Sequence, residues 1–197
     1  MPVPPQFRAG VVLPVRGFVD GKTRLAPRLD AAHRRDLAEE LATRAVTAAR
    51  ADDLSLCVVT SAPEAEAWAD ALGVTVLPDP GSLDTAAAAG HRWAADLGLD
   101  RVVVAHADLP FVTSFAALIP ADVETVVLAP CHRFDGTNAI GLPVPAGFTF
   151  AYGPGSFARH RAEADRRGHP VVIVRDRALA FDVDDPVDLD ELERAAR

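Results

Sequence analysis

The sequence contains few cysteines, no long hydrophobic run and no recognisable targeting segment, and each of these narrows what the protein can be. Its two cysteines, Cys57 and Cys131, have neither the spacing of a metal site nor the number needed for a disulfide framework. No apolar run approaches the ~20 residues that span a membrane. The first ten residues lack the charged and apolar regions of a signal peptide, and their prolines predict an extended tail over residues 1–8. We therefore expect a soluble, cytoplasmic protein without a membrane partner.

Positive residues are fewer than negative ones, which gives a net charge of -8 at pH 7. This disfavours nucleic acid as the main partner, since phosphate backbones bind basic surfaces. A small polyanion can still bind where cations gather locally or where a metal ion bridges the charges. Lys22 is the only lysine, beside 19 arginines. Either its position is due to chance, or a compact point charge is needed there.

Hydrophobic residues make up 49% of the chain, enough for a sizeable core in a single domain over residues 1–197. In the first half, apolar runs alternate with segments of helical periodicity, which predicts a mostly parallel α/β sheet with helices on both faces. Glycines and prolines break the second half into short pieces and predict an irregular antiparallel insertion. The predicted strands are 11–15, 54–60, 74–77, 101–105, 125–129, 171–174 and 179–183. The predicted helices are 31–50, 64–72, 85–97, 156–167 and 188–197.

The loop after the first predicted strand contains GFVDGKT, which suggests phosphate binding. It is not a P-loop, because three residues separate Gly17 from Gly21 and that motif requires four. In open α/β sheets, however, ligands bind beyond the carboxyl ends of the strands, where this loop lies. Arg16, Lys22 and Arg24 could therefore neutralise a triphosphate. The alternative is ordinary surface charge, above all for the neighbouring Arg28.

Carboxylates follow two other predicted strands. If residues 179–183 form a strand, Asp182 and Asp184 point to the same side, and they repel each other unless a cation lies between them. Asp108, in HADLP after the strand 101–105, offers a third carboxylate. Three such oxygen donors suit a hard ion such as Mg²⁺, whereas a solvated strand end is the simpler alternative. Asp185 is placed to cap the last helix.

The segments DGTN and GPGSF suggest a second anion site. Ser156 is predicted to be the N-cap of the helix 156–167, whose free N–H groups would favour an anion. Thr137 and Asn138 offer further hydrogen bonds. Turn and cap chemistry alone also accounts for Gly155 and Ser156.

Five segments occur in the order and approximate spacing of one family, namely VVLPVRGFVDGKTRLAP, HADLP, DGTNAIGL, YGPGSFARH and FDVDDPVDL. The chain resembles, from Val11 to Leu189, the guanylyltransferases of coenzyme F420 biosynthesis, which act on 2-phospho-L-lactate or phosphoenolpyruvate. DGTN, GPGSF and DVDxPxDL are specific to this group. The opening loop and ADLP are shared with related nucleotidyltransferases, such as the molybdenum-cofactor guanylyltransferases.

The resemblance implies a Rossmann-like nucleotidyltransferase fold that joins GMP from GTP to phosphoenolpyruvate or 2-phospho-L-lactate and releases pyrophosphate. It assigns catalysis to Lys22, Asp108, Asp182 and Asp184, and Mg²⁺ to the three aspartates. It assigns nucleotide binding to Pro14, Val15, Arg16, Lys22, Arg24, Asp84 and Thr85. It assigns acid binding to Thr137, Asn138, Gly153, Gly155 and Ser156.

One departure concerns the base. Asp84 stands where the family usually has Asn, in a region expected to face the nucleotide, and a carboxylate can accept hydrogen bonds from guanine but cannot donate. Two alternatives stay open at this point. One is a nucleotidyltransferase of the same fold that acts on molybdopterin or a sugar phosphate. The other is a nucleotide-binding regulator without catalytic activity.

Overall fold

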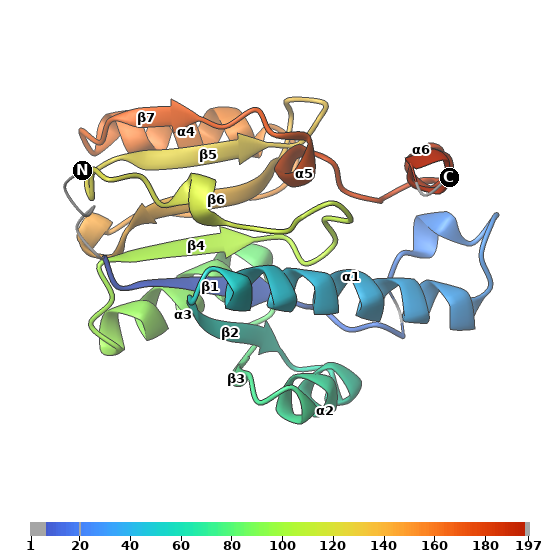
Figure 1. The fold of residues 1–197 in the computed structure, drawn as a ribbon. Coiled ribbons are helices and arrows are strands. Elements are labelled where there is room, and N and C mark those ends of the chain that lie inside the picture. Colours follow the sequence, from blue (N-terminus) through green and yellow to red (C-terminus); the bar gives the residue numbers. More distant parts are fainter. Residues whose placement is uncertain (1–6, 20, 196–197) are drawn as a thin grey trace.

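A computed structural model describes residues 7–19 and 21–195, and its seven described strands join one sheet in the order β3-β2-β1-β4-β6-β5-β7 (Figure 1). The predicted tail over residues 1–8 lies mostly outside the described part of the chain. Only β6 runs antiparallel to its neighbours, β4 and β5, so the mostly parallel α/β sheet is confirmed. The strands are β1 (Ala9–Pro14), β2 (Ser55–Thr60), β3 (Thr75–Pro78), β4 (Arg101–Ala105), β5 (Val126–Pro130), β6 (Thr137–Pro143) and β7 (Val171–Ile173).

Helices cover both faces of this sheet. On one face pack α1, α2 and α5, and on the other α3 and α4. The α-helices are α1 (Ala31–Ala51), α2 (Pro63–Ala71), α3 (Leu83–Asp96), α4 (Ser156–Arg166), α5 (Arg177–Ala180) and α6 (Pro186–Ala195). The short 3₁₀ helices are η1 (Thr23–Leu25), η2 (Ala116–Leu118) and η3 (Val144–Ala146). None of the described helices is long and apolar enough to cross a bilayer.

Local sequence explains where the helices next to the first strand begin and how closely they pack. Asp30 caps α1 by accepting the His33 N–H at 2.9 Å. Ser82 and Thr85 form a reciprocal capping box at the start of α3. Gly90 then lets α3 approach β1, because a Cβ at this position would lie 2.2 Å from a methyl carbon of Val12.

Alternation along the central strands divides the core into two layers. Val11 and Leu13 of β1 face the layer under α1, whereas Val12 faces the layer under α3. A third apolar cluster, which includes Leu25 and Val183, lies away from the sheet and joins η1 to the chain before α6. This cluster brings the C-terminal segment across to the loop that follows β1, as Figure 1 shows.

One predicted strand in the second half was wrong, and one observed strand had not been located. The segment 179–183 is not a strand, because Asp176 caps a short helix, α5, and the chain then leaves the sheet, with Phe181 and Val183 buried in the third cluster. Residues 137–143 confirm the antiparallel insertion predicted for this half, although the sequence analysis did not locate this strand. They form β6, which is buried throughout and hydrogen-bonded on both sides.

Candidate active site

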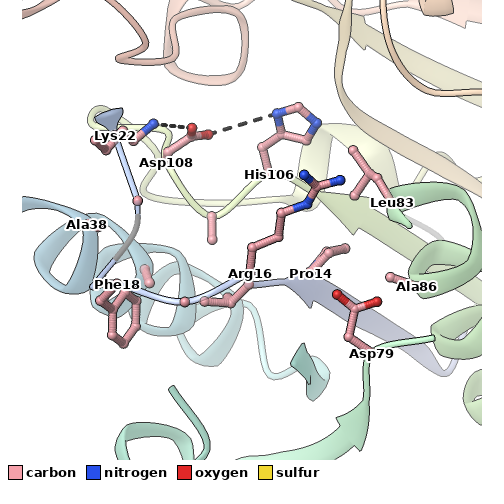
Figure 2. A pocket seen from close by; sticks show the side chains of 15 residues that line it. Pro14, Arg16, Phe18, Lys22, Ala38, Asp79, Leu83, Ala86, His106 and Asp108 are labelled. Atoms are coloured by element: carbon pink, nitrogen blue, oxygen red, sulfur yellow. Dashed lines mark hydrogen bonds and ion pairs between the residues drawn. The ribbon is translucent and has the colours of Figure 1, made fainter. Parts of the chain in front are cut away.

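A pocket of about 190 Å³ opens at the carboxyl ends of β1, β3 and β4 (Figure 2). Parallel strands present these ends at one edge of the sheet, where ligands bind in folds of this class. Lys22 and Asp108 lie at one end of the pocket and Asp79 at the other (Figure 2). Pro14 and Val15, both expected to contact the nucleotide, also line it.

Lys22 follows β1 in the opening loop, and its backbone is left-handed, with a φ of 53°. Such a conformation is uncommon for residues other than glycine and often marks functional sites. Its Nζ donates to Asp108 Oδ2 and lies 3.5 Å from Asp184 Oδ1. Burial alone would lower the pKa of the Lys22 ammonium, but attraction to the two carboxylates raises that pKa above its ordinary value. Lys22 is therefore a fixed positive charge between two carboxylates.

Asp108 lies in the HADLP loop after β4. Burial alone would raise the pKa of its carboxyl, but the charges of Lys22 and His106 hold that pKa below its usual range. His106 Nδ1 lies 3.9 Å from Asp108 Oδ1. This same oxygen is buried and makes no hydrogen bond within the described residues. A buried charged oxygen of this kind is available to a ligand or a metal ion.

Asp182 and Asp184 lie in the segment between α5 and α6, not on a strand as predicted. Asn138 on β6 positions this segment, since its Nδ2 donates to Asp182 Oδ1 at 3.2 Å and to the backbone oxygen of Ala180, the last residue of α5, at 3.0 Å. Burial, then repulsion from Asp108 and Asp184, raises the pKa of the Asp182 carboxyl. The three carboxylates thus share one region and carry more negative charge than Lys22 neutralises.

These carboxylates surround an ammonium in the structure. Within residues 7–19 and 21–195, no group of three or more His, Cys, Asp or Glu side chains is arranged to hold a metal ion. The donor chemistry nevertheless fits Mg²⁺, because carboxylate oxygens are its preferred protein ligands and one buried oxygen of Asp108 has no partner. The Asp108, Asp182 and Asp184 carboxylates could hold such an ion after a local rearrangement around Lys22.

Two arginines predicted to contact the nucleotide lie beside this cluster. Arg16 and Arg24 are exposed and line an open depression together with Lys22 and Asp184. Arg28, the fourth cation of the loop, is instead paired with acidic residues of α6. Within the described part of the chain, the site therefore offers two guanidinium groups without an acidic partner next to one buried ammonium.

Thr137 and Ser156, which were expected to bind the acid, are brought together as predicted but are deeply buried. Each is 1% exposed, and the Thr137 N–H donates to Ser156 Oγ at 3.0 Å. His160 Nε2 accepts the Ala151 N–H at 2.9 Å, so the ring proton resides on Nδ1 and is donated to Thr137 Oγ1 at 3.0 Å. Burial lowers the pKa of His160 to about 4, which keeps the ring neutral. A buried network thus connects β6 to α4.

The start of α4 differs from the sequence prediction. The N-cap is Gly155, with a φ of 74°, and Ser156 is the first helical residue, without a capping hydrogen bond from its side chain. The expected free N–H groups are already used, since Ser156 donates to Gly153 O at 3.0 Å and Phe157 to Asp135 O at 3.1 Å. The glycine turn therefore shapes the loop, and its first N–H groups pair with backbone oxygens.

Asp84 and Thr85 were expected to face the nucleotide, but the structure directs them elsewhere. Asp84 Oδ1 accepts the Tyr152 N–H at 2.6 Å, which connects α3 to the loop before α4. Thr85 Oγ1 accepts the Ser82 N–H at 3.1 Å as part of the capping box. Neither residue lines the pocket at the strand ends.

The sequence analysis named neither Asp79 nor His106 as a site residue, yet both line the pocket. Asp79 directly follows β3, so the rule that ligands bind at the carboxyl ends of strands could have found it. His106 Nε2 is buried without a hydrogen-bond partner among the described residues.

Comparison with known proteins places this geometry in a family. The family described as guanylyl transferase CofC-like matches residues 9–193. The phosphoenolpyruvate guanylyltransferase of Sphaerobacter thermophilus is 38% identical over 187 residues, covering 92% of this chain and 90% of the relative. The 3-phospho-D-glycerate guanylyltransferase of Phenylobacterium zucineum is 33% identical over 196 residues, covering 94% and 90%.

A solved structure supports the fold independently. The crystal structure of a putative nucleotide-diphospho-sugar transferase from Desulfovibrio desulfuricans G20 matches with a TM-score of 0.78 and covers 97% of this chain and 88% of its own. At 18% identity this likeness concerns the fold alone. The predicted Rossmann-like nucleotidyltransferase fold is therefore confirmed. With the match over residues 9–193, the chain belongs to the guanylyl transferase CofC-like family.

Proposed function

We propose that this protein joins GMP from GTP to the phosphate of a small phosphorylated three-carbon acid and releases pyrophosphate. The observation that carries the proposal is the Lys22 ammonium held between Asp108 and Asp184 at one end of the pocket. The names of the relatives, which specify phosphoenolpyruvate and 3-phospho-D-glycerate, support the class of acceptor. They favour it over molybdopterin or a sugar phosphate.

The proposed reaction is an in-line displacement. A phosphate oxygen of the acid attacks the α-phosphorus of GTP and forms a new P–O–P linkage. The bond from the α-phosphorus to the oxygen shared with the β-phosphorus breaks, and pyrophosphate leaves with that electron pair. Lys22 is placed to stabilise the charge that develops on the phosphoryl oxygens, and Arg16 and Arg24 to neutralise the leaving pyrophosphate.

Magnesium is part of the proposal. The partnerless oxygen of Asp108 and the repulsion that raises the pKa of Asp182 both favour an added cation. Asp108, Asp182 and Asp184 would hold Mg²⁺. When bound, the ion would neutralise phosphate oxygens and align the triphosphate. Asn138 would keep the Asp182 carboxylate in position.

We place the acid beside Asp182, at the junction of β6 and α4. Asn138 connects β6 to the aspartate segment, and Thr137 connects β6 to Ser156, so the two strand residues position both sides of this junction. The glycine turn with Gly153 and Gly155 forms its rim. The family resemblance supports a role in coenzyme F420 biosynthesis in the cytoplasm.

The test is a matrix of pyrophosphate release. GTP, ATP and CTP are each combined with phosphoenolpyruvate, 2-phospho-L-lactate and 3-phospho-D-glycerate, with and without Mg²⁺. We expect release only with GTP, one preferred acid and Mg²⁺. If GTP binds but no acid stimulates release, the protein is a nucleotide-binding regulator. If a sugar phosphate or molybdopterin alone stimulates it, the proposed acceptor class is wrong.

A further inference from the structure

The pocket has two chemically different ends. Among the described residues, two carboxylates line it, and they lie at opposite ends (Figure 2). Asp108 pairs with Lys22, in the region that we assign to the phosphates. Asp79 lies next to Leu83 and Ala86, which come from the first turns of α3. A nucleotide with its triphosphate at Lys22 would therefore extend its base toward Asp79.

Hydrogen bonds from the backbone N–H of Asp79 and to one of its carboxylate oxygens hold this residue in place. Its N–H donates to Thr60 O at 3.1 Å and to Ser61 Oγ at 3.0 Å. Its Oδ1 accepts the Gly81 N–H at 2.8 Å. No hydrogen bond to Oδ2 occurs among the described residues. The carboxylate therefore has a fixed orientation and retains acceptor capacity, since each of its oxygens carries two lone pairs.

The walls around Asp79 suit a flat ring. Leu83, Ala86 and Pro14 supply apolar surface there. Such pockets bind aromatic ligands through apolar contact, and a few placed polar groups provide the specificity. Asp84, the residue predicted to contact the base, is committed to the Tyr152 N–H at 2.6 Å. Asp79 is thus the carboxylate placed to contact the base.

A carboxylate at this position favours guanine, because the bases differ in the hydrogen-bonding groups along their edges. Guanine presents two adjacent donors, N1–H and the 2-amino group, and a carboxylate can accept both. Adenine and cytosine present a ring nitrogen lone pair at the corresponding position, which an ionised carboxylate repels. A half-buried carboxylate that meets a lone pair in place of a donor therefore penalises the wrong ligand.

We infer that Asp79 is the residue that reads the guanine base, by accepting hydrogen bonds from N1–H and the 2-amino group. The inference rests on the proposed function for the identity of the nucleotide, and it moves base recognition from Asp84 to Asp79. The preference for guanine then depends on the residue that follows the carboxyl end of β3, away from the residues that carry out the transfer.

The test uses Asp79→Asn and measures dissociation constants by calorimetry, so that it does not depend on turnover. The amide offers one acceptor and one donor, which match N1–H and the 2-carbonyl oxygen of xanthine. For the wild type we expect GTP to bind about tenfold or more tighter than ITP, which lacks the 2-amino group, and XTP to bind more weakly still. In Asp79→Asn we expect GTP to weaken about 10- to 100-fold and XTP to become the preferred nucleotide.

Asp84→Asn is the matched control, because it makes the same change in the carboxylate that faces Tyr152, and its preference for GTP over XTP should equal that of the wild type. A gain of XTP binding cannot arise from a misfolded variant. An unchanged ratio of GTP to XTP in Asp79→Asn, or an equal loss for every nucleotide, would overturn the inference and place Asp79 at the ribose or in a structural role. If no acid is guanylylated while these binding ratios shift as expected, the proposed reaction fails and the base assignment stands.

Discussion

The buried ammonium of Lys22 is the residue on which the proposed chemistry depends most. We expect Lys22→Ala to lower kcat/KM for GTP by about tenfold or more, because a lost contact to a charged group costs about 1.5–3 kcal/mol. The variant also leaves the buried Asp108 without its main counter-charge, so the pKa of that carboxyl should rise. Steady-state kinetics with varied GTP measure the first effect.

Lys22→Arg provides the control for charge alone. It keeps a cation, but its planar guanidinium does not replace a compact ammonium between two carboxylates, so we expect partial recovery at most. Circular dichroism of both variants confirms that the fold is intact. Unchanged kinetics in Lys22→Ala would mean that the chain's only lysine has no part in the transfer.

Asp182 is expected to oppose folding while it supports activity. Its pKa is raised in the folded protein, so its contribution to stability is present at low pH and is lost as the pH rises from its unfolded value through its folded value. Asp182→Asn removes this loss and can keep the hydrogen bond from Asn138. In Mg²⁺-free buffer at pH 7 we therefore expect a melting temperature equal to or above that of the wild type, together with a fall in turnover of about 10²-fold or more.

Thermal melts from pH 3 to pH 8 distinguish this effect from a general gain in stability. The curves of the variant and the wild type should converge at the acid end, because Asp182 is protonated there. The contribution of Asp108 to stability has the opposite pH dependence, since its pKa is lowered and its contribution is lost as the pH falls. Near-wild-type turnover of Asp182→Asn at limiting Mg²⁺ would contradict the metal assignment.

At the scale of elements, the connection between β6 and α4 holds the proposed acid site together. Ser156→Ala and Ser156→Gly both remove the acceptor of the buried Thr137 N–H, which should cost about 1–3 kcal/mol of stability. Glycine should cost less than about 1 kcal/mol more, because Ser156 is the first helical residue and the full cost of glycine applies to the helix interior. We expect both variants to raise KM for the acid and to leave GTP affinity nearly unchanged. If both bind the acid normally, the acid site lies elsewhere.

The contact between α3 and β1 sets the wall of the nucleotide pocket. Gly90→Ala should stabilise an ordinary helix by about 1 kcal/mol, but here the added methyl group would meet Val12 at 2.2 Å. Overpacking of this kind typically costs about 1–3 kcal/mol, so we predict a net loss of stability in urea titrations. Ala89→Gly, one residue earlier in α3, is the matched control and should lose about 1 kcal/mol through propensity alone. A more stable Gly90→Ala would show that α3 can move away from the sheet.

At the scale of the whole molecule, the pattern of the chain predicts most of the architecture. The first half alternates apolar runs and amphipathic segments, and its strands and helices occur where these periods place them. The sequence predicted an antiparallel insertion but not the position of β6, and its strand at residues 179–183 was wrong, because partners distant in sequence decide both. β6 is a strand because it lies between two others. Residues 179–183 leave the sheet because their apolar side chains have a better partner near η1.

The sequence likewise predicts one part of the candidate site and misses another. The rule for strand ends correctly brings Lys22 and Asp108 to one pocket, because topology alone places them there. Side-chain partners are not encoded locally. Asp84 turns to a backbone N–H that lies 68 residues further along the chain, and this leaves the base end of the pocket to Asp79.

The most direct measurement of the central claim follows the phosphorus atoms of GTP. The protein is incubated with Mg²⁺, phosphoenolpyruvate and GTP labelled with ³²P at either the α- or the γ-phosphate, and the products are separated by chromatography. The account predicts that the α-label appears in a new product that also contains the acid, while the γ-label appears only in pyrophosphate. Transfer of the γ-label to the acid, or its release as inorganic phosphate without an α-labelled product, would contradict guanylyl transfer.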